Sequence, residues 1–181
     1  MLDTLSPPSS LSTQLSCLIQ DSPLGNLGLY TSTRGLVHIS FSPSRTQQCV
    51  FRPQDELQET IAQALRRYFS GEPETFTHIP LDLQTGTVFE RAVWSVLRTI
   101  PYGQTQTYQW LSERAGNAKA YRAAGQANRK NPIPIIIPCH RIINKNGQLG
   151  GYQGAGGLNK KTLLLRLERA LPNDASHFSH S

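Results

Sequence analysis

The sequence predicts an α+β protein in which a small N-terminal domain with an antiparallel sheet precedes a mainly helical C-terminal domain. Short apolar runs separated by turn residues occupy the first half, whereas apolar residues at helical spacing dominate the second. The charge also changes sign: residues 1–87 hold 5 Lys and Arg against 8 Asp and Glu, and residues 88–181 hold 13 against 4. The predicted domains are residues 1–86 and 87–171, flanked by a flexible leader at 1–13 and a flexible tail at 172–181.

The N-terminal domain is expected to begin with three short strands. The apolar runs are Leu15–Gln20, Leu27–Ser32 and Leu36–Phe41, and the segments Ser22-Pro-Leu-Gly25 and Thr33-Arg-Gly35 between them have the composition of tight turns. Strands joined by such short turns pair as antiparallel hairpins.

One helix is predicted between Pro53 and Gly71. Its buried face would carry residues at helical spacing: Leu57, Ile61, Leu65, Tyr68 and Phe69. The segment Phe76–Leu83 is expected to form a further strand. This half shows no recognisable chemistry, and no metal site is expected, because its cysteines and histidines lack ligand spacing: Cys17, Cys49, His38 and His78.

The C-terminal domain is predicted to start with an amphipathic helix, Val88–Thr99, that ends at Pro101. A short helix follows, with Thr107 as its N-cap and Gly116 just past its end. A second helix comes directly after that glycine. Two short helices joined by a tight turn predict a winged-helix-like helix-turn-helix.

The second helix of this pair, predicted as Ala118–Lys130 with Asn117 as its cap, is unusually narrow. Arg122 is its main projection, because most other positions are small: Ala118, Ala120, Ala123, Ala124, Gly125 and Ala127. A helix this narrow is compatible with close packing inside a core. It is also compatible with insertion into a DNA groove, where Arg122 would act as the probe. The basic charge of this half is typical of a polyanion-binding surface, although a merely solvated basic surface has the same composition.

Three prolines mark the segment Pro132-Ile-Pro-Ile-Ile-Ile-Pro138, which leads into Cys139, His140 and Arg141. They exclude a helix, and the isoleucines form an apolar run, so we predict an extended, buried arm that fixes Cys139 in place. Cys139 is then either a buried structural residue or a nucleophile whose thiol pKa is lowered by His140 and Arg141. Neighbours on an extended chain point to opposite faces, which favours a relay through water or a histidine turned by a third group.

The remaining chain is expected to form a hairpin, a glycine-rich loop and a helix. Ile142-Ile143 and the Asn146-Gly147 turn predict the hairpin. The loop Leu149–Gly157 lacks the motif of a nucleotide site. Asn159 is expected to cap the last helix, whose buried face is interrupted by Glu168 and otherwise carries Leu163, Leu164, Leu167 and Leu171.

No run of 18 apolar residues is present, and the N-terminus lacks the basic and apolar regions of a secretory signal. Three widely spaced cysteines argue against a disulfide framework. We therefore expect a reducing compartment: the cytoplasm, or the nucleus if the source is eukaryotic.

Several blocks resemble the O6-alkylguanine-DNA alkyltransferases, the methylated-DNA–protein-cysteine methyltransferase family. The central block is Ile137-Pro-Cys-His-Arg141, preceded by Asn131-Pro132 and followed by Gly150-Gly-Tyr152. The match is close over residues 87–170 and weaker at Asp21-Ser-Pro-Leu-Gly25. Further blocks occur in order: Phe89-x3-Val93-Trp94, Ile100-Pro-Tyr-Gly103-x-Thr-x-Thr-Tyr108, Ala120-Tyr-Arg122-Ala-Ala124, Lys161-x-x-Leu164-Leu165 and Glu168.

This resemblance implies DNA repair by direct reversal: one irreversible transfer of a methyl or larger alkyl group from O6-alkylguanine in DNA to Cys139. O4-alkylthymine is a second substrate to be tested. By resemblance, Glu168 holds His140, which draws the Cys139 proton through a water. Asn131 orients the active-site turn, and Tyr108 gives a proton to the leaving guanine. No cofactor and no metal are implied.

The resemblance also implies a partner, double-stranded DNA, bound through the minor groove by a monomer that can associate side by side along it. Arg122 would fill the space left by a flipped-out base, and Tyr108 would lie at the phosphate of that nucleotide. The groove-facing small residues would be Ala120, Ala123, Ala124 and Gly125. The guanine pocket would be walled by Leu149, Tyr152, Gln153, Gly154 and Asn128.

The chain departs from its relatives in having about two extra residues between Tyr152 and Lys161. We interpret this surplus, in Gln153–Gly157, as a pocket wall that adjusts to alkyl groups larger than methyl.

Three other functions remain open. A non-catalytic alkyltransferase-like DNA binder shares the predicted fold but lacks the cysteine, whereas Cys139 is present here. A cysteine hydrolase would turn over repeatedly. A purely structural basic protein would have an inert Cys139.

Overall fold

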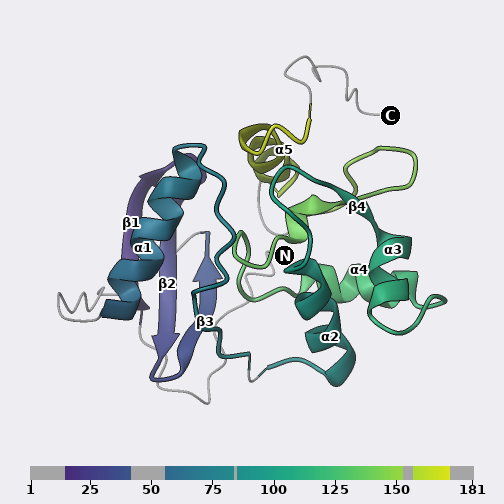
Figure 1. The fold of residues 1–181 in the computed structure, drawn as a ribbon, viewed down its shortest axis with the longest axis horizontal. Coiled ribbons are helices and arrows are strands. Elements are labelled where there is room, and N and C mark those ends of the chain that lie inside the picture. The colour runs from purple at the N-terminus through teal and green to yellow at the C-terminus, as the bar shows by residue number, and fades with distance from the viewer. Residues whose placement is uncertain (1–14, 42–55, 84, 153–156, 172–181) are drawn as a thin grey trace, which may run out of the picture.

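The computed structural model describes residues 15–41, 56–83, 85–152 and 157–171. The predicted leader and tail, and the surplus loop residues 153–156, lie outside this part of the chain. The architecture is α+β, as predicted: a three-stranded sheet with one helix packed along it, and a helical half that lies beside β3 (Figure 1). No helix of the described residues is long and apolar enough to cross a membrane.

The sheet contains β1 (Leu15–Ser22), β2 (Gly25–Ser32) and β3 (Gly35–Ser40) in that order, with both pairs antiparallel. The turns lie where the sequence predicts them. Helix α1 (Glu56–Phe69) runs along this sheet and buries its apolar stripe, which includes Tyr68 (Figure 1). The three strands and the helix are therefore confirmed.

The predicted strand over Phe76–Leu83 is wrong. Phe76 has a positive φ of 56°, and the amide of Ile79 donates to the Phe76 carbonyl at 3.2 Å, so the chain turns there. One parallel bridge remains, between Leu36 and Leu81. The chain passes close to Gly35, where a Cβ would lie 2.5 Å from the Pro80 carbonyl oxygen.

Three helices form the centre of the second half: α2 (Val88–Leu97), α3 (Tyr108–Arg114) and α4 (Tyr121–Arg129). Thr107 caps α3 by accepting from the Trp110 amide at 3.1 Å, as predicted. The indole of Trp94 donates to the Ala127 carbonyl at 2.9 Å and so ties α2 to α4.

Helix α4 starts later than expected. The Asn117 side chain accepts from the Lys119 amide at 3.2 Å, which forms a turn rather than a helix cap. Ala120 occupies the N-cap position and makes no side-chain cap bond. The turn of the helix-turn-helix is consequently longer than the Gly-Asn turn that the sequence predicts.

The predicted hairpin after Cys139 is also wrong. The Asn144 amide does donate to the Gln148 carbonyl at 2.8 Å, which closes the Asn146-Gly147 turn, but no second strand follows it in the described residues. Instead β5 (Ile142–Ile143) pairs in parallel with β4 (Gln106–Thr107). The strand finds a partner distant in sequence, which local turn chemistry does not predict.

The last helix, α5 (Gly157–Leu167), includes Asn159, so that residue is not its cap. Its buried stripe differs from the predicted one, because Leu164 and Leu165 share it with two charged residues, Lys161 and, directly after the end of the helix, Glu168. These four follow the i, i+3, i+4, i+7 spacing of one helical face. The other predicted leucines are only partly buried: Leu163, Leu167 and Leu171.

One hydrophobic core runs through both halves. The amide of Ile39 on β3 donates to the Pro132 carbonyl at 3.0 Å, so the sheet is bonded directly to the segment before Cys139.

A capping box begins α2. The Thr87 hydroxyl accepts from the Glu90 amide at 3.2 Å, and the Glu90 carboxylate accepts from the Thr87 amide at 2.7 Å. Thr87→Ala should lower the free energy of unfolding by about 1 kcal/mol, measured by urea denaturation, because it leaves a helix amide without its cap. Thr87→Ser keeps the oxygen and should lose much less. Equal losses in the two variants would mean that the cap bond is unimportant.

Candidate active site

The segment before Cys139 is a tight turn, not the extended arm that its prolines predict. The Ile137 amide donates to the Ile133 carbonyl at 2.9 Å, and Ile135 has a φ of 75°. Asn131 closes this turn from both ends: its Oδ1 accepts from the Ile133 amide at 3.0 Å, and its Nδ2 donates to the Ile137 carbonyl at 2.7 Å. Prolines exclude a helix but are compatible with turns as well as with extended segments, so they do not by themselves predict an extended arm.

The turn delivers Cys139 into a short 3-10 helix, Cys139–Arg141, where the cysteine is 2% exposed. Asn128 donates to the Cys139 carbonyl at 3.3 Å. Burial raises the pKa of the Cys139 thiol, and the nearby Asn131, Tyr152 and Lys161 offset this rise only in part. The prediction that His140 and Arg141 would lower this pKa is therefore wrong. The resting thiol is protonated at neutral pH and needs a base before it can react.

His140 and Glu168 form a fully buried pair, with 2.8 Å between Nε2 and Oε1. Burial favours a raised pKa for Glu168, but the hydrogen bonds from His140 and Arg141, together with the positive charge of Arg141, outweigh burial and hold this pKa well below the usual range. Burial lowers the pKa of His140, so its ring is neutral. An ionised carboxylate only accepts, and Nε2 must therefore carry the proton. The buried Nδ1 has no partner among the described residues and is free to accept a proton.

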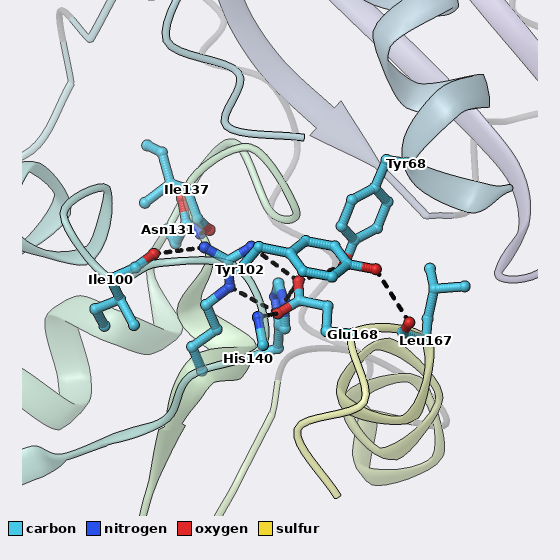
Figure 2. A network of polar contacts seen from close by, with 10 residues as sticks. Tyr68, Ile100, Tyr102, Asn131, Ile137, His140, Leu167 and Glu168 are labelled. Carbon is cyan, nitrogen blue, oxygen red and sulfur yellow. Dashed lines mark hydrogen bonds and ion pairs between the residues drawn. The ribbon is translucent and has the colours of Figure 1, made fainter. Parts of the chain in front are cut away.

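Glu168 is the centre of a larger network (Figure 2). Arg141 binds it through two bonds, Nε to Oε2 at 2.8 Å and Nη2 to Oε1 at 2.9 Å, and its Nη1 donates to the Ile100 carbonyl at 2.6 Å. The Tyr68 hydroxyl donates to Oε1 at 2.7 Å, and the Gly103 amide donates to Oε2 at 3.2 Å. Among these contacts, only the one between His140 and Glu168 was predicted, and that prediction came from the family resemblance.

Lys161 is a second buried charge that sequence reasoning gave no role. Its Nζ donates to the carbonyls of Ile142 and Leu149, and burial lowers its pKa to about 8. It therefore joins the segment after Cys139 to the start of the glycine-rich loop, in which Leu149 was predicted as a pocket residue. Its place in the buried stripe of α5 is the signal that would have pointed to it.

Tyr152 and Tyr108 are both close enough to Cys139 for the thiol to affect their pKa values. Burial and the neighbouring Cys139 raise the pKa of Tyr152 well above its usual value, and its buried hydroxyl has no nitrogen or oxygen partner in the described part of the chain. Burial first, and then Cys139, also raise the pKa of Tyr108. Both phenols are thus protonated near neutral pH. Two other predicted pocket residues, Gln153 and Gly154, lie outside the described residues.

A cavity of about 820 Å³ has Tyr108 among its lining residues. Its walls come from the start of α3, the turn and start of α4, and the segments at 144–145 and 150–151. They include two lysines and an aromatic residue that the sequence analysis did not single out: Lys119, Lys145 and Tyr121. Tyr121 is 50% exposed, and the Arg122 guanidinium lies 5.7 Å from the centre of its ring.

The small residues of α4 do not all face outward. Ala123 is exposed, and Ala120 and Gly125 are partly exposed, with Gly125 lying against the Tyr108 ring and lining the cavity. Ala124 is fully buried, so it packs α4 onto the core and is removed from the groove-facing set. Asn128, predicted as a pocket wall, is buried beneath Cys139 and supports its backbone.

Two protein-family models together match nearly all of the described residues. Residues 88–170 match the family described as 6-O-methylguanine DNA methyltransferase, DNA binding domain, and residues 16–83 match its ribonuclease-like domain. The methylated-DNA–protein-cysteine methyltransferase of Haemophilus influenzae is 43% identical over 151 residues, which are 82% of this chain and 83% of that protein. The protein of that name from Methanosarcina acetivorans is 42% identical over 153 residues, 83% of this chain and 96% of that protein.

A solved structure, Mycobacterium tuberculosis OGT in complex with DNA, has a TM-score of 0.71 and 38% identity to the chain. The match covers 90% of the present chain and 98% of the chain in the solved structure. The similarity therefore extends over both halves of the fold.

Lys161→Met should lower the free energy of unfolding by about 2 kcal/mol at pH 7, because two buried carbonyls lose their donor. Backbone amides at 142–152 should exchange with solvent faster, while those of β2 and β3 serve as the internal control. Unchanged exchange at 142–152 would show that Lys161 does not hold these segments.

The same variant gives a pH prediction. Lys161 has a pKa of about 8 when folded, against about 10.4 for an unperturbed lysine. Between these values the unfolded chain binds the extra proton, so the wild-type stability gains with rising pH. The stability difference between wild type and Lys161→Met should consequently grow from pH 8 to pH 10. A difference that stays constant would mean that the lysine titrates normally.

Proposed function

The chain belongs to the O6-methylguanine DNA methyltransferase family, and from this membership we propose how its own residues carry out the reaction. It is a methylated-DNA–protein-cysteine methyltransferase that binds DNA and repairs O6-methylguanine by direct reversal. The observation that carries the residue assignment is the buried His140–Glu168 pair beside Cys139, with Nε2 directed at the carboxylate and Nδ1 left as a base.

The proposed reaction begins with the thiol. Nδ1 of His140 takes the Cys139 proton through a water molecule, and Glu168 stabilises the imidazolium that forms. The sulfur then attacks the alkyl carbon in line with the C–O6 bond, so an S–C bond forms as that bond breaks. Tyr108 donates a proton to the leaving guanine, a role supported by its protonated state. The cysteine ends as a thioether and the protein acts once.

We propose supporting roles for three residues of the site. Asn131 fixes the turn that carries Cys139, and Asn128 holds the cysteine carbonyl. Tyr152 lies at the thiol and provides an aromatic wall for the base. O4-alkylthymine remains a proposed second substrate.

For DNA, we propose that α4 enters the minor groove and that Arg122 fills the space of the flipped nucleotide, whose base enters beside Tyr108. The exposure of Arg122 and Ala123 supports this orientation. Lys119 and Lys145, which line the cavity, supply positive charge for DNA phosphates. We further propose that the protein works as a monomer, able to associate side by side on DNA, in the cytoplasm or in a eukaryotic nucleus.

Mixing the protein with duplex DNA that contains O6-methylguanine should add the mass of one methyl group, located at Cys139 by peptide mass spectrometry. Activity should be lost in proportion to the amount of lesion. Cys139→Ala should still bind the duplex, because a thiol contributes no phosphate contact. Multiple turnovers, or methylation at Cys17 or Cys49 instead, would contradict the mechanism.

Arg122→Ala should separate base flipping from chemistry. Repair in duplex DNA should slow far more than reaction with free O6-benzylguanine, because the free base needs no extrusion. Single-turnover rates with the two substrates measure this ratio. Arg66→Ala, which removes an exposed arginine of α1, is the matched control and should leave the ratio unchanged. Equal losses on both substrates in Arg122→Ala would show that this arginine is structural.

A further inference from the structure

Tyr68 reaches the active site from the other half of the protein. It lies on α1, in the part of the chain for which the sequence predicts no chemistry, yet its hydroxyl donates to Glu168 Oε1 at 2.7 Å. Figure 2 shows the phenol pointing from α1 at this carboxylate, which follows the end of α5. Both side chains are buried.

The contact falls on the oxygen that His140 uses. Oε1 accepts from three donors, Tyr68, His140 and Nη2 of Arg141, all within 2.7 to 2.9 Å. Each donor withdraws electron density from that oxygen, so the phenol weakens the attraction between Oε1 and the imidazole proton. It also removes the freedom of the carboxylate to rotate. The Tyr68 bond therefore bears on both the direction and the proton affinity of His140.

We propose that Tyr68 is a positioning residue of the methyl-transfer reaction, supplied by the N-terminal half, that sets the orientation and basicity of His140 through Glu168. This inference rests on the proposed role of His140 as the base. It assigns the N-terminal half a part in the chemistry, in addition to its part in the core.

The phenol is suited to this role. Burial and the Glu168 charge raise the pKa of Tyr68 well above its usual value, so it remains a donor. It is not needed merely to join the halves, because other contacts do so: Ile39 bonds Pro132, and the rings of Phe41 and Tyr152 lie 6.4 Å apart. Its own ring packs on Phe69, Phe76 and Tyr102.

The test is the pH dependence of benzyl transfer from free O6-benzylguanine to Cys139, followed by intact-protein mass in single turnovers. Tyr68→Phe keeps the ring contacts and removes only the hydroxyl. Without this donor, Oε1 becomes more basic and the pKa of His140 rises. The acid limb of the rate profile should then move to higher pH by about half a unit to one unit, and the rate on that limb should fall several-fold.

Tyr102→Phe is the matched control. Its hydroxyl donates to the Leu167 carbonyl at 3.1 Å and not to Glu168, so the acid limb should stay in place even if stability falls. A uniform loss of rate in Tyr68→Phe, with an unmoved limb, would overturn the proposal in favour of simple anchoring. Wild-type protein that leaves Cys139 unmodified would instead refute the proposed function, and the two failures are thus distinguishable.

A second measurement uses the wild-type protein and requires no substitution. In the wild-type protein, NMR should detect a slowly exchanging Tyr68 hydroxyl proton whose shift follows the titration of the His140 ring nitrogens. A hydroxyl signal that is insensitive to that titration would overturn the proposal.

Discussion

The carboxylate of Glu168 is withdrawn from water and accepts five hydrogen bonds from four residues. An isolated buried charge costs several kcal/mol, so this carboxylate is tolerable only while its partners stay in place. Those partners come from α1, from the loop after α2, and from the 3-10 helix at Cys139. One buried charge thereby makes the position of His140 depend on segments from both halves of the chain, and the N-terminal half is part of that dependence.

The network also explains the protonation states of the site. Arg141 supplies a full positive charge to the carboxylate through two bonds, so His140 does not have to be charged to keep Glu168 ionised. Burial then keeps the imidazole neutral, with its free nitrogen available to a protonated thiol. The second buried cation, Lys161, is held by backbone carbonyls and does not compete for the carboxylate.

Local patterns predicted local structure well. The apolar runs and turns of the sheet, the stripe of α1 and the Thr107 cap are all confirmed, because each depends on residues a few positions apart. The motif around Cys139 identified His140 and Glu168 as partners only through resemblance. What the sequence did not predict depends on distant pairing: β5 against β4, Tyr68 on Glu168, and Lys161 between two carbonyls. Of these three, only Lys161 has a spacing that marks it as buried, and that spacing does not identify its two carbonyl partners.

The turn before Cys139 holds the thiol in one position. Ile135, a β-branched residue, has a positive φ, a conformation that persists only where the surroundings over-determine it. Asn131 provides that constraint by bonding both ends of the turn, while Asn128 holds the next carbonyl. A thiol fixed in this way, and 2% exposed, does not swing outward to a base inside a duplex. The fixed position of Cys139 thus supports the proposal that the alkylated nucleotide leaves the helix and comes to the sulfur.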